Sequence, residues 1–129
     1  MLRTNSKKAR ENVRNYILSF AENFAVSLEI DPDTLTEKDT LCLVWDSFMK
    51  EYYNQIHPTR RNRSSVSDLF AEWASGLAMD GLFDYYYNVS AVKVLGDILE
   101  ETEEERSKYT EEQAERLLTL LIFREVSEA

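Results

Sequence analysis

The sequence predicts an all-α protein, folded as a single compact bundle of about five helices over residues 1–129. Glycine and proline are scarce, with three and two residues, whereas an all-β chain needs many turns. Apolar residues recur at three- and four-residue spacing along most of the chain. A chain of 129 residues fits one domain and buries about two-thirds of the surface that it exposes when unfolded.

The first helix is expected to begin near Asn5 or Ser6, because either side chain can cap exposed N–H groups. A connector then follows from Glu29 to Asp39, and Asp31-Pro32-Asp33 turns the chain within it. The first helix has one apolar face. Its residues are Val13, Tyr16, Ile17, Phe20, Phe24 and Leu28.

The second helix starts at an approximate capping box, in which Thr36 pairs with Asp39 in place of the usual Glu. Its inward face comprises Leu41, Val44, Trp45, Phe48, Met49, Tyr52 and Ile56. Cys42 lies beside this face and is interpreted as a core or boundary residue. A catalytic thiol would need a basic partner, and the only histidine, His57, stands next to Pro58 at the helix end.

The third helix is expected to begin at Ser65 or Ser67, after the polar loop Pro58–Ser65. Its apolar face is Val66, Leu69, Phe70, Trp73, Ala74 and Leu77. The segment Leu82–Tyr87 that follows is ambiguous between a short helix and an extended strand. Three of its residues could line the core with their hydroxyls in water or form a binding surface: Tyr85, Tyr86 and Tyr87.

A fourth helix is expected from Asn88 or Ser90, packing Val92, Leu95, Ile98 and Leu99 inward. Its other side carries one continuous acidic stripe that faces away from the core. The stripe comprises Asp97, Glu100, Glu101, Glu104 and Glu105.

The last helix follows a capping box from Thr110 to Gln113 and runs from Ala114 to Val126. It is apolar on most sides, which predicts a central position covered by other helices, or a part in a subunit interface.

Charge is distributed unevenly along a chain whose formal net charge is −9. Residues 97–116 hold nine acids and three bases, whereas residues 1–15 hold five bases and one acid. We therefore expect the acidic stripe to pair with the first helix, within the chain or between subunits.

Six basic residues are candidate phosphate contacts, although nucleic-acid binders usually carry a larger basic field. They are Lys7, Arg10, Arg14, Arg60, Arg61 and Arg63.

No catalytic, cofactor-binding or metal-ligating residues are predicted. A single histidine offers little for acid–base chemistry, and no Cys/His spacing suits zinc. Three glycines cannot build a phosphate-cradling loop. One cysteine, no apolar run of membrane-spanning length and no clean signal-peptide core predict a soluble, cytoplasmic protein that does not enter a membrane.

Six stretches of the chain are distinctive when taken together: Asn5–Arg14, Phe70–Leu77, Tyr85–Val92, Leu95–Glu105, Glu112–Glu115 and Ile122–Glu125. They resemble a family of small proteins of unknown function that phages and conjugative elements of gut Firmicutes carry. The resemblance covers both ends of the chain and is weak from Glu29 to Arg63. It implies a bacterial mobile-element setting, and it supplies no activity and no functional residues.

Three functional hypotheses follow. The first is a non-enzymatic protein–protein interaction or accessory module, which would use the acidic stripe and the tyrosines as its surface; its partner is unidentified and a homodimer stays open. The second is a DNA mimic that blocks a host defence or DNA-processing protein, because carboxylates at helical spacing lie about 5–6 Å apart, close to the spacing of phosphates. The third is a nucleic-acid binder that uses the basic clusters.

Overall fold

The computed structural model describes residues 1–56, 63–79 and 90–129, with side chains over 1–52, 66–74 and 90–129. The described chain is all-α, as predicted, and contains no strand. Its elements are α1 (Lys7–Ser27), the 3₁₀ helix η1 (Pro32–Thr34), α2 (Glu37–Ile56), α3 (Arg63–Met79), α5 (Ala91–Leu99), α6 (Glu103–Arg106) and α7 (Glu111–Ser127). Residues Leu82–Tyr87, whose conformation was ambiguous from the sequence, lie outside the described residues.

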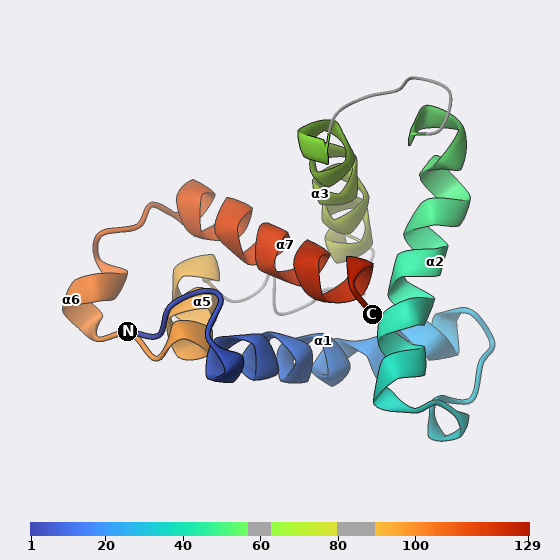
Figure 1. Ribbon diagram of the computed structural model, residues 1–129, viewed down its shortest axis with the longest axis horizontal. Coiled ribbons are helices and arrows are strands. Elements are labelled where there is room, and N and C mark those ends of the chain that lie inside the picture. The colour runs from blue at the N-terminus through green and yellow to red at the C-terminus, as the bar shows by residue number, and fades with distance from the viewer. Residues whose placement is uncertain (57–62, 80–89) are drawn as a thin grey trace.

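Helix α7 is the centre of the bundle, and it contacts α1, α2, α3 and α5. In Figure 1, α1 lies along one side of α7, α2 and α3 stand against one end, and α5 and α6 lie at the other end. The prediction that the last helix is central is confirmed.

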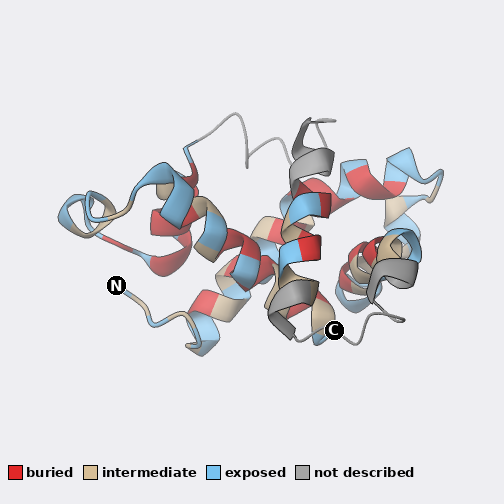
Figure 2. Cartoon of the chain, turned by 90° about the horizontal axis from the view of Figure 1, so that it is seen from above, coloured by how far each residue is buried: buried red, intermediate tan, exposed pale blue. Residues whose placement is uncertain are grey.

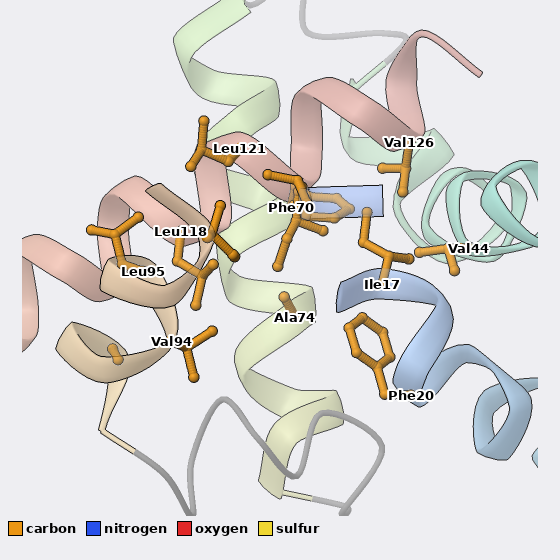
Figure 3. Close-up of a cluster of buried hydrophobic side chains, with 14 of the residues drawn as sticks. Ile17, Phe20, Val44, Phe70, Ala74, Val94, Leu95, Leu118, Leu121 and Val126 are labelled. Carbon is orange, nitrogen blue, oxygen red and sulfur yellow. The ribbon is translucent and has the colours of Figure 1, made fainter. Parts of the chain in front are cut away.

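The core lies where these helices meet, and buried residues line their facing sides (Figure 2). Side chains from five helices converge there: Ile17 and Phe20 from α1, Val44 from α2, Phe70 and Ala74 from α3, Val94 and Leu95 from α5, and Leu118, Leu121 and Val126 from α7 (Figure 3). Phe48 is fully buried at the α2–α3 contact. Its ring centroid lies 5.2 Å from that of Phe70 and 5.6 Å from that of Trp73.

The predicted helix starts are confirmed at four of the five caps, and Ser90, which caps α5, is one of the four. The Ser6 hydroxyl accepts from the Ala9 N–H at 3.1 Å. In the box at Thr36, the Asp39 N–H donates to Thr36 Oγ1 at 3.1 Å and the Thr36 N–H donates to Asp39 Oδ2 at 3.2 Å. Thr110 and Gln113 form the same reciprocal pair. Helix α3 instead begins at Arg63, before both predicted caps, Ser65 and Ser67.

The predicted fourth helix is two helices, because the chain turns at Glu100. This residue adopts a left-handed conformation with φ 53°, and the Glu101 N–H donates to the Gly96 carbonyl at 2.8 Å. These are the features of a Schellman ending. A capping box then starts α6, with the Glu105 N–H donating to Thr102 Oγ1 at 3.2 Å. The prediction of one continuous acidic helix is therefore wrong.

Arg106 holds α6 against α5. Its Nε donates to the Glu101 carbonyl at 3.1 Å, and its Nη2 lies 3.0 Å from Asp97 Oδ1. The side chain lies over Gly96, where an added Cβ would stand 2.5 Å from Arg106 Nε and 2.7 Å from its Cδ. Gly96 is buried, so its lack of a side chain makes room for this contact.

Gly96→Ala should lower the free energy of unfolding by about 1–3 kcal/mol, because the new methyl group overpacks against Arg106. Denaturant unfolding measures the change. In an Arg106→Ala background the clash is gone, and the better helix propensity of alanine should make the same substitution neutral or stabilising. An equal cost in both backgrounds would contradict the packing described.

Candidate functional site

The acidic residues predicted to form one interaction surface are divided by the turn at Glu100. Asp97 lies in the last turn of α5 and pairs with Arg106. Glu104 and Glu105 lie on α6, where Glu105 closes the capping box and the Thr102 N–H lowers the pKa of its carboxyl group. The tyrosines assigned to the same surface, Tyr85, Tyr86 and Tyr87, lie outside the described residues.

Glu101 is buried, which corrects the prediction that it faces away from the core. It is 6% exposed, and neither carboxylate oxygen has a partner in hydrogen-bonding geometry among the residues that the structure describes. Burial raises the pKa of this carboxyl group above its ordinary value, and nearby Glu105 raises it further. Tyr109 and Arg106 lower the pKa and only partly offset these effects.

Glu101→Gln should therefore raise the free energy of unfolding at neutral pH, because it removes a charge that folding must desolvate. The folded-state pKa of Glu101 is raised above 4.5, so the ionised carboxylate opposes folding as pH rises through that folded pKa. Below the unfolded value the carboxyl group is protonated in both states and the difference between variant and wild type should vanish. Denaturant unfolding across this pH range measures the difference. A gain that persists in acid, or a loss at neutral pH, would contradict this assignment.

Arg10 and Arg14 of α1 pair with Glu125 of α7 and not with the acidic stripe. The pairing expected within the chain is therefore wrong for these two residues, and pairing between subunits stays a prediction. Arg10 Nε lies 2.9 Å and Arg14 Nε 3.2 Å from the carboxylate of Glu125. Arg124 Nε contacts the same carboxylate at 3.3 Å. Glu125 is only 4% exposed. We call Arg10, Arg14, Arg124 and Glu125 the Glu125 cluster.

The Glu125 cluster contains two of the four basic residues of α1. Arg10 also pairs with Glu128, and hydrogen bonds to these two carboxylates raise the pKa of its guanidinium. Two candidate phosphate contacts, Arg10 and Arg14, are thus already paired within the chain. Lys7 is exposed and has no ion pair with another described residue. The other candidates, Arg60, Arg61 and Arg63, lie outside the described side chains.

The structure adds a surface that the sequence analysis missed, an open groove of about 730 Å³ between the end of α1, α2 and α3. We call it the α1–α2 groove. Its apolar wall is formed by Phe24, Leu28, Ile30, Leu43 and Trp73. Leu28, expected on the inward face, is 43% exposed, because it caps the C-terminal end of α1.

Three ionisable residues of α2 line the same groove: Asp46, Lys50 and Glu51. Glu51 Oε2 accepts a hydrogen bond from Trp73 Nε1 at 2.9 Å. None of the three forms an ion pair with another residue in the described part of the chain. A second hollow, of about 490 Å³, lies between α1 and α5 and is lined by Tyr16, Val94 and Asp97 among others. Of the predicted surface residues that the structure describes, Asp97 alone lines either of these two hollows.

Within the described residues, no group of three or more His, Cys, Asp and Glu side chains is arranged to hold a metal ion. None of the described helices combines the length and the apolar character needed to cross a membrane. Comparisons of the chain with protein-family models, curated proteins and solved structures found no match.

Proposed function

We propose that this protein is a non-enzymatic protein-binding module and that the α1–α2 groove is its docking face. The proposal rests on apolar side chains that are exposed at the end of α1, where the groove lies. Val26 is 58% and Leu28 43% exposed at the end of α1, and Leu28 lines the groove. Exposed apolar patches with a polar rim mark interaction sites on folded domains.

The wall of the groove is held rigidly, which favours binding because less side-chain freedom is lost on association. Trp73 packs edge-to-face on Phe24 with a centroid distance of 6.1 Å, and its indole ring also contacts Phe48 and Phe70. The hydrogen bond to Glu51 fixes the other edge of the ring. An incoming apolar side chain would therefore meet a preformed surface.

Affinity capture from a lysate of the native host tests the proposal with two matched variants. Leu28→Gln places an amide at the groove, and Leu120→Gln makes the same change on α7, where Leu120 is 44% exposed. A partner retained by wild type and by Leu120→Gln but lost by Leu28→Gln is the expected result. Circular dichroism establishes that both variants are folded. A partner that binds all three proteins equally well would contradict the groove as docking face.

DNA mimicry and nucleic-acid binding stay predictions. The same capture with the double variant Glu100→Gln, Glu104→Gln tests mimicry. Both residues are exposed and have no ion pair within the described residues. Loss of a DNA-processing protein from this variant, but not from Leu28→Gln, would favour mimicry over the groove.

A further inference from the structure

We propose that the occupant of the α1–α2 groove is a basic apolar peptide segment of another protein, in which an apolar anchor side chain is flanked by Lys or Arg. This inference rests on the proposed function and adds the chemistry of the partner. It rests on the charged side chains around the groove, which form no ion pairs with other described residues.

The α2 side of the groove is acidic. Asp46 and Glu51 contribute two carboxylates against the single ammonium group of Lys50, and all three residues are exposed. The one hydrogen bond that Glu51 accepts from Trp73 leaves its charge without a cation among the described residues. Asp46 likewise has no described cationic partner. The α2 side therefore offers carboxylates next to an apolar wall.

Two further acidic residues are the sequence neighbours of a residue that lines the groove. Glu29 and Asp31 flank the lining residue Ile30, and both are exposed and without a described ion pair. Over the whole chain the formal net charge is −9, so the long-range field also attracts cations. A basic segment gains from both, whereas an acidic segment is repelled. Charge complementarity of this kind governs partner choice and association rate.

A second copy of this chain is a poor occupant. The chain has two basic segments, one at the start of α1 and one from Arg60 to Arg63. Docking the first into a neighbour's groove would break the ion pairs that hold Arg10 and Arg14 to Glu125. A second copy also carries the same net charge of −9 and is repelled as a whole. We therefore assign the groove to a different protein, and self-association through the groove is an outcome that would overturn the proposal.

Selection from a displayed library of random peptides tests the inference directly. The wild-type protein is the bait, and peptides that also bind Leu28→Gln are removed. The expected survivors carry an apolar residue with Lys or Arg on either side and a net positive charge. Survivors that are neutral or acidic would overturn the inference and leave the docking face in place. If no peptide distinguishes wild type from Leu28→Gln, both the inference and the proposed docking face fail.

A selected peptide then reports on the individual carboxylates. The double variant Asp46→Asn, Glu51→Gln should bind it about fivefold more weakly, because each exposed pair contributes a fraction of a kcal/mol. The Gln side chain can still accept from Trp73, so the wall is preserved. Glu112→Gln on α7, which removes the same charge from an exposed pair with Arg116, should leave affinity unchanged. Unchanged or tighter binding by the double variant, or a wild-type protein that sediments as a dimer dissociated by Leu28→Gln, would overturn the inference.

Discussion

Glu125→Gln is expected to lower the free energy of unfolding by about 3 kcal/mol, because three arginines converge on this one buried carboxylate. The amide cannot balance their charges, and the contact between the start of α1 and the end of α7 loses its charged centre. The cost lies at the lower end for a buried pair, since the arginine side chains are themselves 26–47% exposed. Denaturant unfolding at neutral pH measures the change.

Glu112→Gln is the matched control on the same helix. Its ion pair with Arg116 spans exposed side chains at 3.6 Å, and such pairs contribute less than about 1 kcal/mol. Equal destabilisation by the two substitutions would show that burial and convergence at Glu125 have no special effect.

A further expectation follows from the second contact of Arg124, whose Nη2 donates to the Thr4 carbonyl at 2.6 Å. Loss of Glu125 should therefore increase hydrogen exchange in residues 1–10.

Phe48→Ala is expected to destabilise the fold by about 4 kcal/mol, because it deletes a fully buried ring and leaves a cavity. Phe48 is the hub of the aromatic cluster, with centroids 5.2–5.6 Å from those of Trp45, Tyr52, Phe70 and Trp73. Its loss would loosen α2 against α3. Thermal or denaturant unfolding gives the magnitude.

Leu120→Ala provides the comparison for Phe48→Ala, since Leu120 is 44% exposed on α7. Surface substitutions of this kind usually change stability by within about 0.5 kcal/mol. A small effect at Phe48, or a large one at Leu120, would contradict the position of the core. Because Trp73 lines the α1–α2 groove, Phe48→Ala should also weaken groove binding in the fraction that stays folded.

The fold class could be predicted from the sequence because its signals are local. Capping by Ser6, Thr36 and Thr110 involves residues three positions apart, and the apolar spacing identifies each helix face. The break at Glu100 also had a local signal, since Thr102 and Glu105 match a capping box. The apolar spacing up to Leu99 and the acidic spacing beyond it concealed that signal, because both fit one longer helix.

The candidate site could not be predicted, because it depends on contacts between distant parts of the chain. Arg10 and Glu125 are 115 residues apart, and charge counts alone favoured the nearer acidic stripe as partner. Burial of Glu101 likewise follows from the turn after α5. Leu28 had a weak signal: as the last apolar position of α1 it precedes Glu29, whose φ of 61° ends the helical path. The groove is lined by residues of α2 and α3 as well as α1, so it forms only when these helices pack together.

The mobile-element setting, the cytoplasmic location and the oligomeric state stay predictions. The groove bears on the last of these, since its acidic surroundings favour a basic partner over a second acidic chain.

The central claim is that the α1–α2 groove binds a basic apolar segment. An NMR titration of the labelled protein with a selected cationic peptide tests it most directly, because every backbone amide reports separately. We expect the shifted amides to cluster in residues 24–30 and 43–51, and to stay unshifted when Leu28→Gln replaces wild type. Shifts centred instead on Asp97–Arg106, the acidic segment predicted from the sequence, would contradict the claim.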